Sequence, residues 1–423
     1  MHFMTFSTLL SAVQLVTALA TVPPSEDPFY MVPLDIEASP PGAVLRIRTD
    51  PSNVTSVLNC SAAYNILYRT TDAGLRASWA VTTLLIPHHE VLATTNGTHV
   101  ARLLSYQIPY NTADPDASPS HLLSTLYATA ASPAPADYIA HALARGWYVS
   151  VPDFEGPNAA FFAGPQSGFA VLDSIRAVLS QSKLACWTDA RYTMWGYSGG
   201  SFASFWAAEL QASYAPDVKF VGMAIGGMPS NVTHALQQLS GTAAAGFVPS
   251  ILLGVTAPFP EARQYIVKSL KTEGPFNATS FLACLRYNFL EYSTAYAGQD
   301  MYKYFANGRD VLNAPIIAHL LGNNVLPTYH GIPQMPIYAY KAVQDELLPV
   351  QYTDAHMQRY CEASVDVLYQ RNSIGNHEEE LANGAPEAVK WITRWLNGDT
   401  TEVIKGCTVQ DVAVNITQAL AYR

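Results

Sequence analysis

The pentapeptide GYSGG at 196–200 places a serine among small residues in the G-x-S-x-G pattern of a nucleophile elbow. An apolar run before it, 191–195, predicts a strand, and a run rich in Ala, Ser and Phe after it, 201–211, predicts a helix. At a sharp turn from strand to helix the hydroxyl of Ser198 stands exposed, and residues larger than glycine clash across the turn. Ser198 is therefore the candidate nucleophile, and the alternative is an inert serine in a turn of small residues.

Asp345 and His377 fit the two remaining roles, because a nucleophilic serine needs a base and the base needs an acid that orients it. Asp345 follows the predicted strand 336–343, at the carboxyl end where open α/β sheets place their sites. His377 lies in the loop between the last predicted strand and the last predicted helix. Since α/β-hydrolases order nucleophile, acid and base in this way, we expect Ser198, Asp345 and His377 to form a catalytic triad.

Other residues compete for the two roles from weaker positions. The competing acids are Glu346, which points differently from its neighbour, and three aspartates that follow no predicted strand: Asp310, Asp354 and Asp366. The competing bases are His330, which precedes Asp345, and His356, which lies inside a predicted helix. The non-catalytic alternatives are a helix N-cap for Asp345 and a solvated loop residue for His377.

The acidic run Glu378 to Glu380 predicts the first turn of a helix, where the helix dipole favours negative charge. No second histidine stands at helical spacing beside it, so we expect no metal site. A serine nucleophile needs no cofactor, and we expect none. Together with Asp345 the run is expected to favour the protonated imidazole of His377, unless burial under a cap opposes this.

An oxyanion hole requires two hydrogen-bond donors. The backbone N–H of Gly199, directly after the nucleophile, is the first. The second is expected from the loop that follows 105–109, and we assign it to Asn111. A turn-forming asparagine is the alternative for Asn111.

Strands and helices alternate along most of the chain, which predicts a largely parallel sheet with helices on both faces. The predicted strands are 64–71, 79–87, 102–109, 147–153, 191–195, 219–226, 336–343 and 365–371. The predicted helices are 137–145, 168–182, 201–211, 352–363 and 387–396. Residues 231–330 interrupt this alternation with helical patterns around 233–239, 261–271 and 281–296. Because the interruption follows the strand after Ser198, it predicts a helical cap above the nucleophile.

With 423 residues, of which 49% are apolar, the chain is long enough for one large α/β domain with an insertion. Its expected parts are a signal peptide at 1–20, a Pro-rich, irregular extension at 21–60, the first part of the core at 61–230, the cap at 231–330 and the second part of the core at 331–423. The net charge of −10 argues against nucleic acids and anionic membrane surfaces as partners. We expect a monomer.

The first twenty residues are apolar over about a dozen positions and end in Ala-Leu-Ala, as in a secretory signal peptide. A membrane anchor is the alternative, but the run is short for a span. N-x-S/T sequons agree with an extracellular protein and predict glycosylation at Asn53, Asn59, Asn96, Asn231, Asn277 and Asn415. Five cysteines, Cys60, Cys186, Cys284, Cys361 and Cys407, allow two disulfides and one free thiol.

The chain resembles the fungal secretory lipase family, the lipase A-like branch of the α/β-hydrolase superfamily, over most of residues 60–410. The resemblance rests on GYSGG with its small-residue helix and SYAPD at 213–217, on IGGMP after the next strand, on QDELLPV at 344–350, on GNHEEE at 375–380 and on FEGPNAAFFAG at 154–164. It implies the triad Ser198, Asp345 and His377 and the oxyanion donor Gly199. The family's second donor is an acidic side chain that corresponds to Asn111, whose amide donates without being protonated.

The resemblance also implies a disulfide between Cys361 and Cys407. A second family bridge uses Cys284, with Cys60 as its expected partner here and Cys186 as the other choice. Pairing of Cys60 leaves Cys186 as the free thiol, which we expect to be buried between a helix and the strand before Ser198.

The implied activity is ester hydrolysis through an acyl-enzyme on Ser198, with a small-molecule or lipid ester as substrate. The first hypothesis is a secreted lipase of the triacylglycerol type, whose cap makes transient contact with lipid. The alternative is a carboxylesterase or deacetylase of soluble esters such as acetylated secondary metabolites, since trichothecene-deacetylating esterases share this family. A catalytically silent binding protein with the same fold is the third hypothesis, but no triad member is missing.

Overall fold

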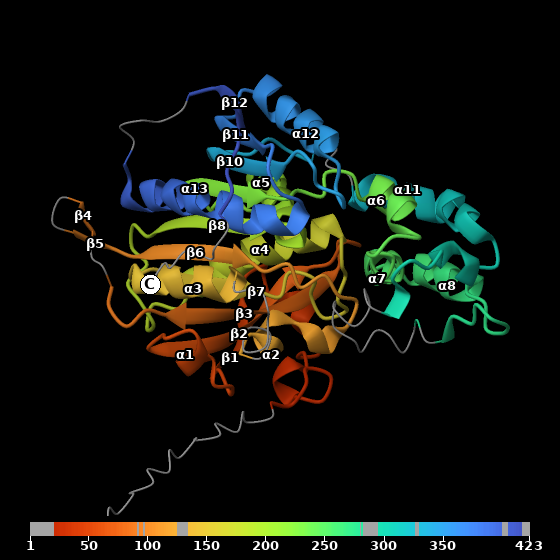
Figure 1. Cartoon of the computed structure of the whole chain (residues 1–423). Coiled ribbons are helices and arrows are strands. Elements are labelled where there is room, and N and C mark those ends of the chain that lie inside the picture. Colours follow the sequence, from red (N-terminus) through yellow and green to blue (C-terminus); the bar gives the residue numbers. More distant parts are fainter. Residues whose placement is uncertain are drawn as a thin grey trace, which may run out of the picture.

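The computed structural model describes residues 21–90, 93–95, 98–124, 134–279, 281, 295–325, 330–399 and 405–416, so the proposed signal peptide lies outside the described residues. A ten-stranded sheet runs through the middle of this part of the chain (Figure 1). In spatial order its strands are β1 (Val44–Thr49), β2 (Ala62–Thr71), β3 (Ala77–Ile86), β7 (Tyr148–Pro152), β6 (Arg102–Gln107), β8 (Arg191–Tyr197), β9 (Gly222–Gly226), β10 (Ile337–Ala342), β11 (Val367–Asn372) and β12 (Cys407–Val412). A separate hairpin consists of β4 (Ala93–Thr95) and β5 (Thr98–Val100).

The sheet is parallel from β7 through β12, and β1, β2 and β3 add an antiparallel edge. Parallel pairing brings the carboxyl ends of neighbouring strands level with one another. Tyr197 of β8 pairs with Gly226 of β9, and Ala342 of β10 pairs with Asn372 of β11. The loops that follow β8, β10 and β11 therefore meet at one edge of the sheet, as expected for an α/β protein.

Helices cover both faces of the sheet, as predicted. On one face, the apolar core includes buried residues of α4 (Gly164–Leu179), α5 (Gly199–Tyr214) and α12 (Val350–Glu362). On the other face, a second core includes buried residues of α3 (Ala134–Ala144) and α13 (His377–Asn397). The shorter helices are α1 (Val54–Val57), α2 (Pro119–Leu122) and the 3-10 helices η1 (Pro28–Tyr30), η2 (Ile36–Ala38) and η3 (Pro115–Ala117).

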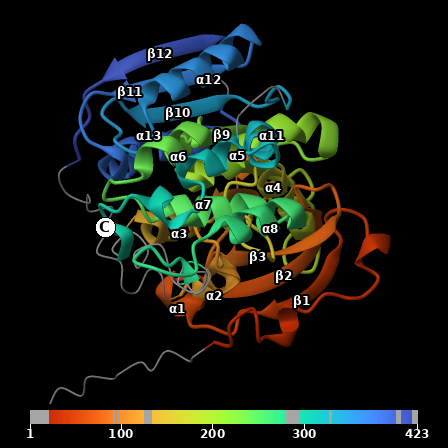
Figure 2. The same ribbon diagram turned by 90° about the vertical axis from the view of Figure 1, so that its right-hand side faces the viewer.

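Between β9 and β10 the described residues form a series of helices, and we call residues 232–324 the helical insertion. Its helices are α6 (Val232–Leu239), α7 (Phe247–Thr256), α8 (Pro260–Ser269), α11 (Pro315–Asn324), η5 (Met301–Tyr304) and η6 (Gly308–Asn313). They gather at one end of the sheet in Figure 1, and Figure 2 shows them in front of the sheet. The predicted helix at 281–296 lies almost entirely outside the described residues, whereas α7 and α11 were not predicted.

Two edge strands were not predicted. The Pro-rich extension 21–60 contains β1, which pairs with β2 in the main sheet, so the prediction for residues 44–49 was wrong. After the last predicted helix, β12 pairs with β11 and closes the opposite edge. Both strands have partly or fully exposed residues along their length, so they lack the buried apolar run that marks a central strand.

Helix α13 begins ten residues before its predicted start at 387. It begins at His377, with Asn376 as N-cap and a capping box that joins Asn376 and Glu379. The prediction placed this helix at 387–396, directly after Pro386. Pro386 instead lies inside this helix, and His377 is the first helical residue rather than a loop residue.

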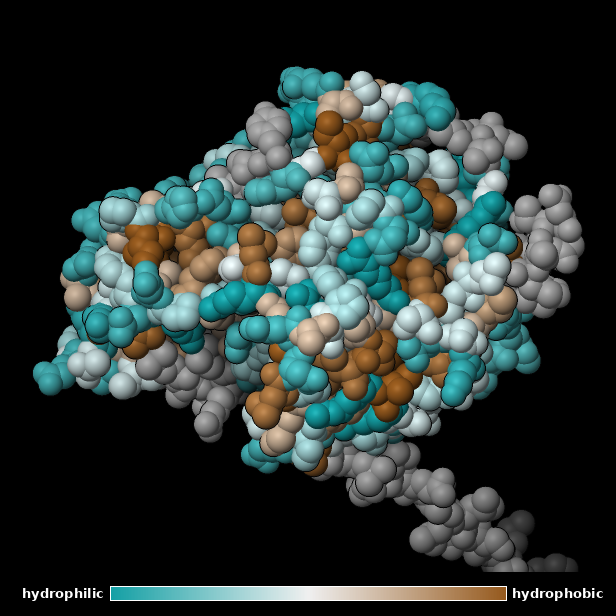
Figure 3. Space-filling model, turned by 180° about the vertical axis from the view of Figure 1, so that it is seen from behind, coloured by the Kyte–Doolittle hydropathy of each residue, from teal (hydrophilic) through white to brown (hydrophobic). Residues whose placement is uncertain are grey.

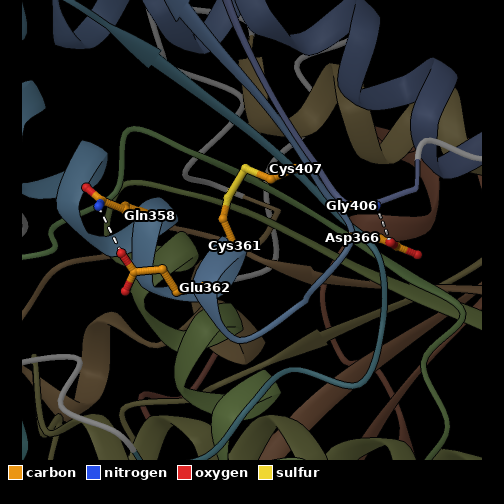
Figure 4. Close-up of a disulfide and its surroundings, with 6 residues drawn as sticks. All are labelled: Gln358, Cys361, Glu362, Asp366, Gly406 and Cys407. Carbon is orange, nitrogen blue, oxygen red and sulfur yellow. Dashed lines mark hydrogen bonds between the residues drawn. A yellow bond between two sulfur atoms is a disulfide. The ribbon is translucent and has the colours of Figure 1, made fainter.

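The cysteines follow the resemblance in one pairing only. A disulfide joins Cys361, near the end of α12, to Cys407, the first residue of β12, and holds this helix against the edge of the sheet (Figure 4). Beside it, the N–H of Gly406 donates to Asp366 over 2.7 Å (Figure 4).

The expectation of a Cys60–Cys284 bridge was wrong, because Cys60 is a free thiol. Its side chain is buried in an apolar cluster with Val54 and Leu58, and this burial raises the pKa of Cys60 to about 11. Cys284 lies outside the described residues. Cys186 is also a free thiol, but it is exposed rather than buried, and the neighbouring Trp187 packs its ring against Tyr148.

The sequon asparagines differ in their surroundings. Three of them are exposed: Asn59, Asn277 and Asn415. Asn53 and Asn231 are partly buried, and Asn96 lies outside the described residues. The side chain of Asn231 already accepts the N–H of His234 as the N-cap of α6.

The surface seen from behind is largely hydrophilic, with apolar residues gathered in separate patches (Figure 3). Across the described ranges, no helix has both the length and the apolar content of a membrane span.

Candidate active site

Ser198 lies at a strained turn between β8, which ends at Tyr197, and α5, which begins at Gly199. Its backbone has φ 51° and ψ −123°, and its N–H donates to the carbonyl of Gly226 over 2.9 Å. The flanking glycines are required by close contacts. A Cβ on Gly196 would stand 2.3 Å from the carbonyl carbon of Gly200, and a Cβ on Gly200 would stand 1.9 Å from the carbonyl oxygen of Gln107. The packing of the turn thus explains both glycines of the motif.

His377 bridges the other two predicted residues. Its Nε2 lies 3.0 Å from Oγ of Ser198, and its Nδ1 lies 2.6 Å from Oδ2 of Asp345. The backbone of His377 is held as well, because its N–H donates to Glu346 and its carbonyl accepts from the hydroxyl of Tyr197. The imidazole is therefore fixed by its position at the start of α13 and by contacts from two strand ends.

Asp345 is buried just beyond β10, and both of its carboxylate oxygens are occupied. Oδ1 accepts the backbone N–H groups of Leu347 and Leu348 over 3.0 and 2.7 Å. Oδ2 accepts from His377 and from the ammonium of Lys341, each over 2.6 Å. Burial by itself raises the pKa of Asp345, but the hydrogen bonds and charges of His377 and Lys341 outweigh it and lower that pKa to about 2. Asp345 is therefore an anion at every pH relevant to activity.

Lys341 was missed by the sequence reasoning. Its side chain is fully buried in β10, where burial lowers its pKa and the charges of Asp345, Glu380 and Glu346 oppose that change. The one available signal was a lysine in the middle of an otherwise apolar strand, four residues before Asp345. A lysine in such a position is rarely buried without a partner.

The acidic run Glu378 to Glu380 forms the first turn of α13, as predicted, and its three side chains differ in exposure. Glu378 and Glu379 are exposed, and their N–H groups donate to the N-cap Asn376. Glu380 is buried and accepts from the amide of Asn372 over 2.7 Å, and burial raises its pKa to about 7. The run therefore consists of two exposed carboxylates and one buried carboxyl group with a raised pKa.

Asn111 lies directly against Gly199, in a backbone conformation with φ 47°. A Cβ on Gly199 would stand 2.0 Å from Oδ1 of Asn111, so a larger residue there would force this side chain to move. Oδ1 is buried and accepts no hydrogen bond from any described residue. Rotation of the Asn111 side-chain amide by 180° exchanges the positions of Oδ1 and Nδ2, and it then directs an N–H donor toward Gly199.

Two buried acidic residues beyond β7 are hydrogen-bonded to the segment that carries Asn111, Asp153 through its carboxylate and Glu155 through its backbone N–H. Asp153 accepts the N–H of Ser120 over 2.8 Å, and the hydroxyl of Tyr110 accepts the N–H of Glu155 over 2.6 Å. Burial raises the pKa of Asp153 to about 7 and raises that of Glu155 strongly. These contacts were not predicted, and they join the loop to the segment that follows β7.

The competing residues have other partners. His356 is buried in α12 beside Ser230 and Glu209, at 3.2 and 3.4 Å, and His330 stacks on Trp206. The remaining aspartates contact residues away from Ser198: Asp354 contacts Arg371, Asp366 contacts Lys405 and Asp310 contacts Asn313. The structure thus brings together Ser198, His377, Asp345, Gly199 and Asn111, and leaves these alternatives elsewhere.

This arrangement has the chemical parts needed for acyl transfer. A hydroxyl lies within hydrogen-bond reach of an imidazole, the imidazole is oriented by a buried carboxylate, and the first N–H of a helix lies next to the hydroxyl.

Comparison with known proteins agrees with this chemistry. The model of a family described as secretory lipase matches residues 124–403. The chain is 45% identical to trichothecene C-3 esterase of Fusarium sporotrichioides, over 94% of this chain and 89% of that protein. It is 34% identical to lipase A of Arthroderma benhamiae, over 94% of this chain and 85% of that protein.

Among solved structures, Candida antarctica lipase A in its closed state matches with a TM-score of 0.82 and 26% identity, covering 93% of this chain and 91% of that one. The α/β-hydrolase fold predicted from the sequence is confirmed by this likeness.

Proposed function

This chain belongs to the secretory lipase family, and from that premise we propose that Ser198, His377 and Asp345 carry out its ester hydrolysis. Lipase and esterase relatives make the chain a carboxylic ester hydrolase. The observation that most directly supports the assignment of residues is the continuous path of hydrogen bonds from Asp345 through His377 to Ser198.

In the proposed mechanism, Nε2 of His377 takes the proton of Ser198 as Oγ attacks the carbonyl carbon of the ester. Asp345 keeps the other ring nitrogen protonated and stabilises the imidazolium. Collapse of the tetrahedral intermediate expels the alcohol, which receives its proton from His377. A water molecule then attacks the acyl-enzyme with His377 again as base, and the carboxylic acid leaves.

The developing oxyanion is held by the N–H of Gly199 and by the amide of Asn111. The close packing of these two residues supports this assignment, because both can face the same oxygen. We expect no metal or cofactor to take part.

For the substrate, we favour soluble esters, such as acetylated secondary metabolites. The support is the 45% identity to trichothecene C-3 esterase, compared with 34% to lipase A of Arthroderma benhamiae. The family model and the likeness to Candida antarctica lipase A support the second candidate, a lipase for acylglycerols whose helical insertion touches the lipid surface.

A substrate profile separates the two candidates. Hydrolysis is measured with p-nitrophenyl esters of increasing chain length. In a second assay, hydrolysis of tributyrin is measured at concentrations below and above the solubility limit of tributyrin. For a soluble-ester hydrolase we expect the highest kcat/KM with short acyl groups and no rise in rate when droplets form. A sharp rise at the solubility limit identifies a lipase.

The Ser198→Ala variant tests the nucleophile. We expect kcat to fall by at least about 10⁴-fold with the fold intact, because no other group can form the acyl-enzyme. Ser213→Ala, which removes an exposed hydroxyl from the same helix, is the matched control and should keep full activity. Hydrolysis at near wild-type rate by folded Ser198→Ala would contradict the proposal.

We further propose that the chain is exported and glycosylated. The apolar start at 1–20, the family of secretory lipases and the exposed sequons Asn59, Asn277 and Asn415 support this. N-terminal sequencing of the secreted protein should begin at Thr21, and treatment with an N-glycosidase should lower its apparent mass.

A further inference from the structure

Lys341 has no part in the mechanism above, although its ammonium touches the acid of the proposed triad. Both Nζ of Lys341 and Nδ1 of His377 lie 2.6 Å from the same oxygen, Oδ2 of Asp345. The two nitrogens are therefore at most about 5 Å apart, a separation at which like charges repel strongly inside a protein. Neither the lysine nor the aspartate side chain has any exposed surface, so water does not screen them.

We propose that Lys341 is a positioning residue whose buried charge partly neutralises Asp345 and so opposes protonation of the imidazole of His377, the base of the proposed mechanism. This inference rests on the proposed function, since it concerns the base of that mechanism. In a triad without such a cation, the carboxylate stabilises the imidazolium without opposition. Here, protonation of His377 adds a second positive charge beside the first.

The other charged and titratable groups around the imidazole do not reverse this effect. Glu346 accepts from the backbone N–H of His377, and Tyr197 donates to its carbonyl. Glu380 is buried on α13 with Asn372 as partner, and its raised pKa keeps it largely protonated in the acidic range. Among the described residues that contact Asp345, Lys341 is the only one with an ammonium group.

The lysine is also replaceable without leaving the acid unsatisfied. Without it, Asp345 still accepts from Leu347, Leu348 and His377. Methionine has a similar length and no charge, so Lys341→Met removes the cation and keeps most of the packing in β10. Arginine restores the charge, and glutamine keeps a donor without a charge.

The test compares the pH dependence of kcat/KM for a soluble short-chain ester from about pH 4 to about pH 9, the range in which histidines usually titrate. For Lys341→Met we expect the midpoint of the acidic limb to rise by about one to two pH units. Lys341→Arg should return it toward the wild-type position, and Lys341→Gln should behave like Lys341→Met. Lys390→Met removes an exposed ammonium from α13 and should leave the midpoint unchanged.

A purely structural role gives a different result. If Lys341→Met lowers activity equally at every pH, or leaves the midpoint within about 0.3 units of wild type, the proposal is wrong. If Lys341→Met does not fold, Lys341→Gln provides the same comparison. A midpoint that rises with Lys341→Arg as well also overturns it, because the charge is then not the cause.

A second readout separates this proposal from the proposed function. In the background of Ser198→Ala, the downfield proton resonance of the His377 ring follows the protonation of the imidazole without any turnover. We expect its titration midpoint to rise when Lys341→Met is added. If Ser198→Ala keeps full activity, the proposed function fails, and this titration still decides the role of Lys341.

Discussion

Asp345 makes four hydrogen bonds at one buried carboxylate, and only one of them is to the imidazole. The two backbone N–H groups fix its orientation, and Lys341 adds a counter-charge. Glu346, the neighbouring acid, contacts His377 through the backbone N–H alone. The two adjacent carboxylates therefore have different roles, because Asp345 contacts the ring of His377 and Glu346 contacts its main chain.

For this reason Asp345→Asn should lower kcat by about 10³ to 10⁴-fold, since the amide no longer favours the required tautomer of His377. Glu346→Gln is the matched control, and it should lose much less, because its amide oxygen can still accept the backbone N–H. Both variants are measured with a soluble ester at a pH on the plateau. If Glu346→Gln proves the more damaging change, the acid has been misassigned.

Asn111 provides a second prediction at the scale of single residues. Asn111→Ala should lower kcat by about 10² to 10³-fold with little change in KM, because the lost donor acts on the transition state. Asn111→Asp should retain activity only toward acidic pH, since a carboxyl group donates only when it is protonated. An alanine variant within twofold of wild type would show that Asn111 serves only the turn.

At the scale of secondary structure, α13 connects stability to catalysis because its first residue, His377, is the proposed base. The capping box of Asn376 and Glu379 sets where this helix starts, and so sets the height of the imidazole above the sheet. The disulfide at Cys361 and Cys407 acts on the neighbouring α12 and β12 and fastens the edge of the sheet beyond β11.

Asn376→Ala should therefore reduce both stability and activity. Loss of an N-cap lowers the free energy of unfolding by about 1 kcal/mol, and fraying of the first turn displaces His377. Asn397→Ala, at the exposed opposite end of the same helix, is the control and should change neither. Chemical denaturation and kcat/KM measured on the same samples check this. A loss of stability without any loss of activity would separate the cap from the catalytic geometry.

At the scale of the whole molecule, buried acids make stability depend on pH, and Asp153 and Glu380 are two of them. Burial raises the pKa of Asp153 and of Glu380 to about 7, well above their ordinary values. Between the ordinary and the raised pKa the folded chain binds more protons than the unfolded chain, so stability falls as the pH rises through this window. Asp345 acts in the opposite sense, because its lowered pKa adds stability that is lost only as the pH falls toward about 2.

Glu380→Gln should reduce this slope. Above pH 7 the variant should be more stable than wild type by about 1 to 3 kcal/mol, and below the ordinary glutamate pKa the difference should vanish. Glu378→Gln, on the exposed side of the same turn, should leave the slope unchanged. Thermal unfolding across this range decides the matter, and an equal gain at acidic and alkaline pH would show that the effect is not due to ionisation.

Much of the fold was readable because it depends on local patterns. The apolar runs of β2, β3, β6, β7, β8, β10 and β11 and the helical spacing in α3, α4, α5 and α12 were predicted within a few residues. The edge strands β1 and β12 were missed because exposed positions break the apolar pattern. Helix α7 was missed because Pro249 and Gly254 lie within its apolar run.

For the site, the sequence by itself determined the strand–turn–helix setting of Ser198 and the order in which Asp345 and His377 follow the carboxyl ends of strands. Both are local sequence patterns: glycines occur where a turn leaves no room for a Cβ, and polar residues follow the ends of apolar runs. Only the tertiary structure decided that Lys341 and His377 share one oxygen of Asp345, that Asn111 lies on Gly199, and that Cys60 stays a free thiol. These contacts depend on how strands and loops that are far apart in the sequence pack against one another. The sequence pattern does not show which ionisable side chains become buried, and burial changes their pKa values.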